Sequence, residues 1–167
     1  YLASGRLGLP ALEVLARDPR VRLLGVGTQP DRPRGRQRRP EPTVIAARAE
    51  ALGLTAERLP SVNAEAFLTR LRAAPPDLLV VAAFGQILRA ALLGLPRCGC
   101  LNLHASLLPR HRGASPINAA VLAGDRQTGV TFMRMDAGLD TGPIYRTLAT
   151  DIGADETAEQ LEARLAA

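Results

Sequence analysis

The chain has 167 residues, a length that fits one α/β domain better than two, and 47% of its residues are hydrophobic while only 3% are aromatic. Its 21 basic residues are all arginine and exceed the 16 acidic residues by five; the absence of lysine excludes a Schiff-base lysine and a phosphate-binding loop that ends in Gly-Lys-Ser/Thr. No apolar run approaches the roughly 18 residues that would span a membrane, so we expect no membrane association.

Short aliphatic runs alternate with helical segments along the chain. Residues 77–83, DLLVVAA, are the clearest candidate for a buried parallel strand, and residues 1–3 resemble the end of another. We predict further strands at 21–28, 100–104, 129–135 and 144–150. We predict helices at 9–17, 43–52, 64–73, 88–95, 117–123 and 156–167. This order is typical of an open, mostly parallel sheet with helices on both faces, which binds ligands at the carboxyl ends of its strands.

The two cysteines, Cys98 and Cys100, are separated by one residue. In an extended segment they would point to opposite faces, so a disulfide is disfavoured and a reducing cytoplasm is the expected compartment. His104 and His111 lie close enough in sequence to raise a mixed Cys/His metal site. Because the spacing matches no zinc pattern, we expect ordinary thiols and no metal.

Residues 29–40, QPDRPRGRQRRP, carry most of the excess positive charge of the chain. Five arginines stand against Asp31 alone, a net of +4: Arg32, Arg34, Arg36, Arg38 and Arg39. Three prolines and a glycine disfavour a helix or a central strand here. The segment is either a solvated basic loop or an arm that contacts nucleic-acid phosphates. Since it has no aromatic residue for stacking, an arm of this kind would contact phosphates and not read bases.

Polar residues of three types could meet at one edge of the predicted sheet. Asn102 and His104 are two apart on a strand and therefore share a face, and Asp140 follows a later strand in the sequence DAGLDTG. Together they could carry out acyl transfer, with the amide donating to a developing oxyanion, the imidazole donating to it or handling a proton, and the carboxylate fixing the imidazole. Gly138 and Gly142 would let the chain turn tightly around the aspartate.

Ordinary structural roles remain open for the same residues. A histidine at a strand end is commonly a satisfied structural group, and Asn or Asp beside glycines commonly forms caps and turns. Ser106 lacks the Gly-x-Ser-x-Gly elbow of a serine nucleophile and is better explained as a turn hydroxyl. Cys100 lies at the start of a predicted buried strand, which makes it a weaker nucleophile candidate still.

The stretch LNLHASLLPRHRGASPINAAVLAGDRQTGVTFMRMDAGLDTGPI resembles the central block of the folate-dependent formyltransferases. In it, Asn102, His104 and Asp140 match the catalytic Asn, His and Asp of that family in type, order and spacing. SGRLGLPALEVL, TQPDRPRGRQRRPEPTVIAARA and VVAAFGQIL are similar to segments of the branch that acts on methionyl-tRNA. The resemblance implies a Rossmann-like catalytic domain over residues 1–167, without the C-terminal β-barrel domain that helps to hold tRNA in that branch.

Transfer of a formyl group from 10-formyltetrahydrofolate to the α-amino group of initiator methionyl-tRNA, at translation initiation, is what the resemblance implies. We expect a cytoplasmic monomer without a metal. The implied folate contacts are Phe84, Gly85, Gln86, Ile87, Leu88, Ser106, Leu107, Leu108, Pro109, Asp136 and Leu139. In the basic segment, Arg36 occupies the position of a residue important for tRNA.

Two other functions remain open from the sequence. Another formyltransferase, acting on glycinamide ribonucleotide or a nucleotide-linked aminosugar, would share the same three catalytic residues, and only the arginine-rich segment argues against it. A non-catalytic nucleotide-binding module would use the glycine motif SGRLG at residues 4–8, which lacks the full dinucleotide fingerprint.

Overall fold

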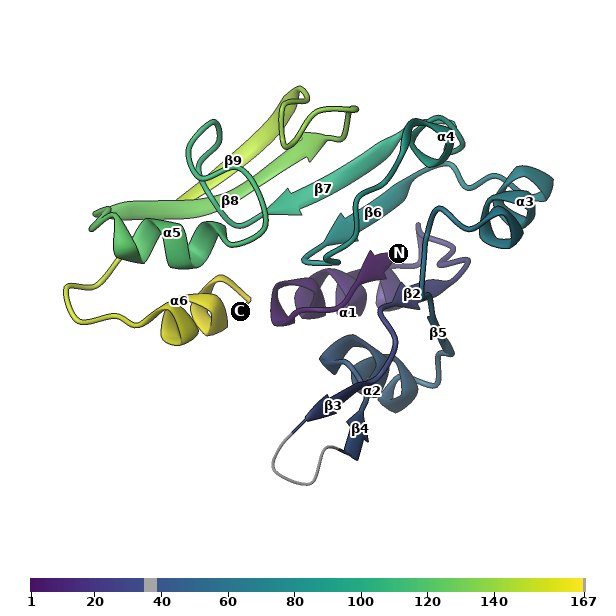
Figure 1. Cartoon of the computed structure of the whole chain (residues 1–167), viewed down its shortest axis with the longest axis horizontal. Helices are drawn as coiled ribbons and strands as arrows, with labels where there is room; N and C mark the ends of the chain where they lie inside the picture. The colour runs from purple at the N-terminus through teal and green to yellow at the C-terminus, as the bar shows by residue number, and fades with distance from the viewer. Residues whose placement is uncertain (35–38, 167) are drawn as a thin grey trace.

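The computed structural model describes residues 1–34 and 39–166, and its central feature is a sheet with the strand order β5-β2-β1-β6-β7-β8-β9 (Figure 1). The strands from β5 to β7 are parallel, and β8 and β9 extend the sheet in antiparallel orientation. The strands are β1 (Leu2–Ala3), β2 (Val26–Thr28), β5 (Ala56–Arg58), β6 (Leu79–Ala82), β7 (Cys100–His104), β8 (Gln127–Arg134) and β9 (Ile144–Asp151). The predicted open, mostly parallel sheet is therefore confirmed.

The helices lie close to their predicted positions. They are α1 (Leu9–Arg17), α2 (Val44–Ala51), α3 (Glu65–Ala73), α4 (Ala90–Leu93), α5 (Pro116–Leu122) and α6 (Ala158–Leu165), with a 3-10 turn η1 (Arg6–Gly8) before α1. Thr43 begins α2 by accepting a hydrogen bond from the Ala46 amide. Thr157 and Gln160 form a reciprocal capping box at the start of α6. Within the described residues, no helix combines the length and apolar character needed to cross a membrane.

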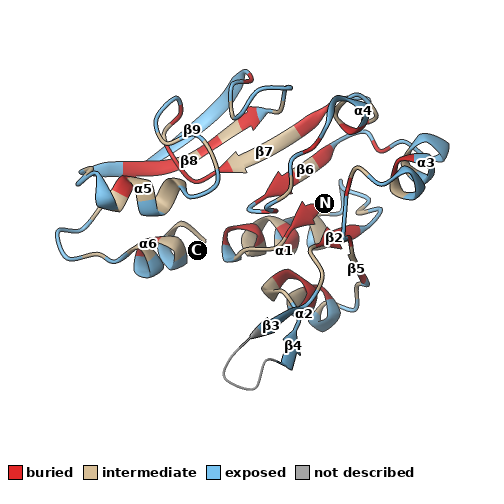
Figure 2. Ribbon diagram, in the orientation of Figure 1, coloured by how far each residue is buried: buried red, intermediate tan, exposed pale blue. Residues whose placement is uncertain are grey.

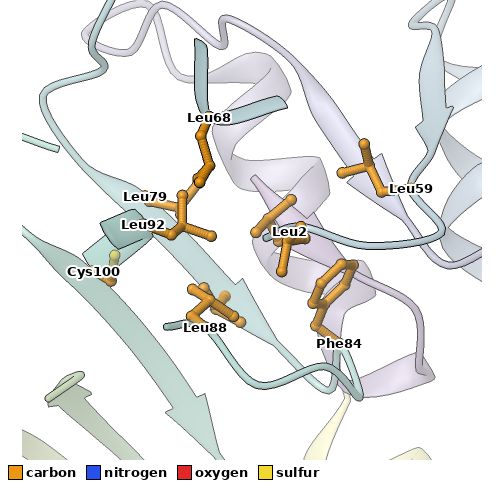
Figure 3. Close-up of a cluster of buried hydrophobic side chains, with 10 residues drawn as sticks. Leu2, Leu59, Leu68, Leu79, Phe84, Leu88, Leu92 and Cys100 are labelled. Carbon is orange, nitrogen blue, oxygen red and sulfur yellow. The ribbon is translucent and has the colours of Figure 1, made fainter. Parts of the chain in front are cut away.

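Hydrophobic clusters cover the two faces of the central strands. One contains Leu2, Leu59, Val62, Leu68, Leu79, Val81, Phe84, Leu88, Leu92 and Cys100, and packs α3 and α4 against the sheet (Figure 3). The other contains Tyr1, Ala3, Leu12, Val26, Ile45, Ala46, Ala49, Ala56 and Ala82, and packs α1 and α2 against the opposite face. Neighbouring residues of β1 and β6 belong to different clusters because strand side chains alternate. Figure 2 shows this burial on the central strands and the exposed edge strand β9.

Leu12 gives a direct test of the second cluster. It is fully buried in α1, whereas Val14 in the same helix is 62% exposed. Replacing Leu12 with alanine should lower the free energy of unfolding by about 2–5 kcal/mol, because the substitution removes buried apolar atoms and leaves a cavity. Val14→Ala, the matched control, should change it by no more than about 0.5 kcal/mol. Urea unfolding followed by circular dichroism measures both, and equal midpoints for the two variants would contradict this packing.

Two strands of the main sheet differ from the prediction. The predicted strand 21–28 is limited to Val26–Thr28, because its neighbour β1 offers only a short ladder that pairs Leu2 with Gly27. The strand β5 was not predicted, since its three residues, Ala56–Arg58, include two charged side chains and no apolar run. It is an edge strand beside β2, and Arg58 forms ion pairs with Asp31 and Glu50 there.

The arginine-rich segment forms a separate two-stranded antiparallel ribbon. Its strands are β3 (Arg32–Arg34) and β4 (Arg39–Glu41), with Pro33 opposite Pro40. Since this ribbon is not part of the main sheet, it agrees with the expectation that no central strand forms here. Residues 35–38 lie outside the described residues. Figure 1 shows the ribbon at the side of the molecule near α2.

Candidate active site

A cavity of about 740 Å³ lies at the carboxyl ends of β6 and β7. Residues 83–88, 102–105, 113–118 and 135–140 line it, and α6 contributes Ala158, Glu159 and Glu162. The volume is in the range of small-molecule binding sites. From β1 the chain continues to β2 and β5 on one side, and it then returns to β6 and continues to β7 on the other side. Open α/β sheets commonly bind ligands at the point where the strand order reverses in this way.

Asn102, His104 and Asp140 meet in this cavity. The two strand residues project from the same face of β7, and the aspartate comes from the turn between β8 and β9. Asn102 Nδ2 donates to Asp140 Oδ1 over 3.4 Å, and His104 Nδ1 lies 3.6 Å from Asp140 Oδ2. The structure therefore brings together the three side chains that the sequence selected, although they are separated by up to 38 positions.

The hydrogen bonds indicate which nitrogen of His104 carries a hydrogen. His104 Nε2 lies 2.9 Å from the backbone oxygen of His111. A carbonyl oxygen can only accept, so Nε2 carries a hydrogen in this arrangement. Nδ1 is the other ring nitrogen, and it faces the Asp140 carboxylate. In the charged form of His104, Nδ1 can donate a hydrogen bond beside that carboxylate.

Backbone groups hold the Asp140 carboxylate in place. The amide of Gly113 donates to Asp140 Oδ2 over 2.8 Å, and the side chain is largely buried. Earlier in the same turn, Asp136 Oδ1 accepts from the Gly138 amide at 3.0 Å and from the Thr141 hydroxyl at 2.8 Å. Asp136 thus stabilises the turn, which is the structural role that the sequence left open for an aspartate beside glycines. It also lines the cavity.

Strained backbone also gathers at this site. Among the described residues, the non-glycine residues with positive φ are Ala83 at 42°, His111 at 52° and Asp140 at 52°. Ala83 and Asp140 line the cavity, and His111 binds His104 through its carbonyl. Such conformations cost about 1–3 kcal/mol each and persist where the surrounding structure enforces them, commonly at functional sites. Nothing in the sequence marks Ala83, because alanine has no preference for this conformation.

Residues 84–88, for which the resemblance implies folate contacts, line the cavity. Ile87 is 78% exposed and Leu139, which also lines the cavity, is 62% exposed, so both offer apolar surface to a ligand. Gln86 has a different use for its side chain, which accepts from the Val62 amide at 2.9 Å and donates to the Leu59 carbonyl at 2.8 Å. Its backbone is then the part available to a bound molecule.

Ser106, Leu107, Leu108 and Pro109 do not belong to the cavity lining, unlike the other implied folate contacts. Ser106 is fully buried, and its hydroxyl donates to the Arg110 carbonyl over 2.6 Å. Its own carbonyl accepts from the buried Thr131 hydroxyl. The segment therefore ties the loop after β7 to β8.

Several cavity residues were missed by the sequence reasoning. They are Leu7, Ser115, Pro116, Ile117, Asn118, Ala158, Glu159 and Glu162. Gln29 was also missed; it supports the wall from outside by donating from Nε2 to the Phe84 carbonyl at 2.6 Å. The sequence signal for this contact is the glycine at position 85. Its φ is 77°, and a Cβ there would come within 2.4 Å of Gln29 Nε2.

The arginines of the basic segment are only partly described. Arg32 and Arg39 are exposed on β3 and β4. Arg32 also donates to the side-chain oxygen of Gln29. Arg36, Arg38 and the side chain of Arg34 lie outside the described residues. The ribbon thus places basic residues beside Gln29, whose side chain bonds to the Phe84 carbonyl at the cavity.

Cys98 is exposed and Cys100 is buried, and both are free thiols. Burial raises the pKa of the Cys100 thiol to about 11, so this group stays protonated near neutral pH and is a poor nucleophile. In residues 1–34 and 39–166, no group of three or more His, Cys, Asp and Glu side chains is arranged to hold a metal ion.

A family profile described as formyl transferase matches residues 12–167. The chain belongs to this family. A methionyl-tRNA formyltransferase of Halorhodospira halophila is 55% identical over 99% of this chain and 53% of its own length. One from Thermus thermophilus is 48% identical over 94% of this chain and 51% of its own length. The chain thus spans about half the length of the curated relatives it matches.

Solved structures support the formyl transferase fold. A phosphoribosylglycinamide formyltransferase from Streptococcus pneumoniae superposes with a TM-score of 0.75 at 27% identity, covering 98% of this chain and 87% of that protein. A sugar N-formyltransferase from a Shewanella species gives 0.60 at 25% identity, covering 72% of this chain and 46% of that protein. These likenesses extend to family members with different amine acceptors.

Proposed function

We propose that this chain forms the catalytic domain of an enzyme that transfers a formyl group from 10-formyltetrahydrofolate to the α-amino group of initiator methionyl-tRNA. The convergence of Asn102, His104 and Asp140 on one cavity carries the proposal. Identities of 45–55% to relatives named methionyl-tRNA formyltransferase support the choice of acceptor. The likeness to the phosphoribosylglycinamide enzyme, at 27% identity, is lower.

The residues around the cavity fit a bound folate. Exposed apolar side chains at Ile87 and Leu139 could pack against a flat ring. Backbone at 84–88 and 135–140 could bind the polar ring edges, since the side chains of Gln86 and Asp136 are engaged within the protein. When bound, 10-formyltetrahydrofolate would supply the formyl group.

The three polar side chains can then act on the reacting centre. Asn102 Nδ2 has two hydrogens, of which one is directed to Asp140, so the other can be donated to an oxygen that becomes negative. Charged His104 can donate from Nδ1 to the same oxygen. Asp140 stabilises that charge and can accept the proton that the attacking amine loses. The bond between the formyl carbon and the folate nitrogen then breaks, and a proton delivered to that nitrogen lets tetrahydrofolate leave as the amine becomes an amide. Because the amine itself is the nucleophile, no acyl-enzyme on Ser106 or Cys100 is required.

Mass spectrometry of methionine released from initiator tRNA tests the proposal. The protein is incubated with charged tRNA and 10-formyltetrahydrofolate, and parallel reactions offer glycinamide ribonucleotide or a nucleotide-linked aminosugar as the acceptor. We expect formylated methionine from wild-type protein, and none from Asp140→Ala within the same time. Formylation of another acceptor, with methionyl-tRNA left unmodified, would replace the proposed substrate.

The basic segment has its own expected result within this proposal. Replacing Arg36 and Arg38 together with alanine should weaken tRNA binding and reduce the slope of log affinity against log salt by about 0.7–0.9 for each phosphate that is no longer neutralised. Folate binding should not change. Arg20→Ala is a suitable control because this exposed arginine pairs locally with Asp18. Filter binding at several salt concentrations measures the slope, and a fall in folate affinity would instead assign the segment a structural role.

A further inference from the structure

The loop from Arg110 to Gly113 contacts both titratable members of the site. The backbone oxygen of His111 accepts from His104 Nε2 at 2.9 Å, and the amide of Gly113 donates to Asp140 Oδ2 at 2.8 Å. A shift of this loop would therefore change the hydrogen-bond partners of the imidazole and of the carboxylate together. Its position decides which nitrogen of His104 carries a hydrogen.

Asp125 anchors this loop from the turn after α5. His111 Nε2 lies 2.6 Å from Asp125 Oδ2, and Arg110 donates to Asp125 Oδ1 over 2.5 Å. The Asp125 side chain is 10% exposed and the His111 side chain is 17% exposed, so their contact is largely shielded from water. Shielding makes such a charged hydrogen bond stronger than an exposed one.

The backbone of His111 needs an anchor of this kind. Its φ of 52° lies in the left-handed region, which is unfavourable for a residue with a side chain. Without its ring contact, the backbone could relax and rotate the carbonyl away from His104 Nε2. The ring contact of His111 thus holds its strained backbone, and that backbone holds the carbonyl that accepts from His104.

We propose that His111 and Asp125 are positioning residues, which hold the His111 carbonyl so that His104 keeps its hydrogen on Nε2 and presents Nδ1 to Asp140 and to the reacting centre. This inference rests on the proposed function for its effect on turnover, although the hydrogen position can be measured in the free protein. Neither residue touches the reacting atoms, and neither lines the cavity. They act through the histidine.

Nitrogen NMR of the imidazole rings tests the inference directly, because the chain has only two histidines. We expect wild-type His104 to carry its hydrogen on Nε2 when neutral. Asp125→Ala and His111→Ala should each populate the Nδ1–H form, and in the second variant His104 is the single histidine observed. If either variant fails to fold, the other supplies the spectrum, and Asp125→Asn keeps an oxygen that can accept from His111.

Turnover supplies the second measurement. Asp125→Ala should reduce kcat for formyl transfer by about ten- to a hundredfold with folate affinity unchanged, and Asp125→Asn should recover much of the loss. Arg110→Ala removes a partner of Asp125 whose side chain is 64% exposed and keeps the shielded contact between His111 and Asp125. It is therefore the control, and its kcat should be close to wild type. The same His104 tautomer in wild type and Asp125→Ala would overturn the inference. Absence of any transfer by wild-type protein would instead reject the proposed function and leave the NMR result to stand.

Discussion

Replacing Asn102 with alanine should reduce the rate of formyl transfer by about a hundred- to a thousandfold, which is the usual cost of removing one oxyanion donor. The reason is that the substitution removes the second Nδ2 hydrogen directed to the cavity, while the backbone of β7 keeps its ladder with β6 and β8. Single-turnover transfer from 10-formyltetrahydrofolate measures the effect. Folate binding, followed by fluorescence titration, should remain because the apolar walls are intact.

Gln127→Ala is a matched control for this variant. Gln127 Nε2 donates to Asp151 Oδ1 over 2.9 Å, so the control also removes an amide that is bonded to a carboxylate, but at the exposed edge of the sheet. Its rate should equal that of wild type. His104→Ala should lose at least as much activity as Asn102→Ala, and near-normal single-turnover transfer by either would remove these residues from the reaction.

The fold could be predicted where one local pattern dominates. The continuous aliphatic run around β6 predicts a strand buried on both faces, and β6 contributes residues to both hydrophobic clusters. The apolar spacing in α1 predicts one buried face, and Leu12 on that face belongs to the second cluster. The edge strand β5 could not be predicted, because its pairing depends on the neighbouring β2 and not on its own charged residues. For the same reason, the true extent of β2 follows from its neighbour, since apolar residues occur along most of 21–28.

The candidate site could be predicted for side chains that lie on regular elements or in a recognisable turn. Asn102 and His104 share a face because of the strand period, and Asp140 was found through its glycine-rich turn. Contacts made by backbone were not predictable, as the His111 carbonyl shows. The residue type does not indicate the positive φ of His111 or its contact with Asp125. Both features depend on how the loop after β7 folds against α5.

The SLLP segment, residues 106–109, shows what a resemblance to a family leaves open. A resemblance can place a segment near a site without saying which of its atoms face the ligand. The buried Ser106 hydroxyl satisfies the Arg110 carbonyl, and this contact fixes the start of the loop that continues to His111. The segment therefore contributes to the site through the loop that it anchors.

Gly142→Ala should lower turnover by about a hundredfold, because the Asp140 turn depends on a close backbone approach at this glycine. A Cβ there would lie 1.9 Å from the carbonyl oxygen of Arg134 and 3.0 Å from its carbonyl carbon. Neither is a flexible side-chain end, so the turn must move away from β8. Asp140 lies two residues earlier, and its contacts with Asn102 and the Gly113 amide would lengthen.

The matched control for this substitution is Gly25→Ala, because a Cβ at Gly25 meets nothing within 4 Å. This control should keep wild-type turnover. Overpacking at Gly142 should also reduce the free energy of unfolding by about 1–3 kcal/mol, so the assay must be run where urea titration shows the variant to be folded. A folded Gly142→Ala protein with wild-type turnover would mean that the position of Asp140 does not limit the reaction, and the role given to its carboxylate would have to be withdrawn.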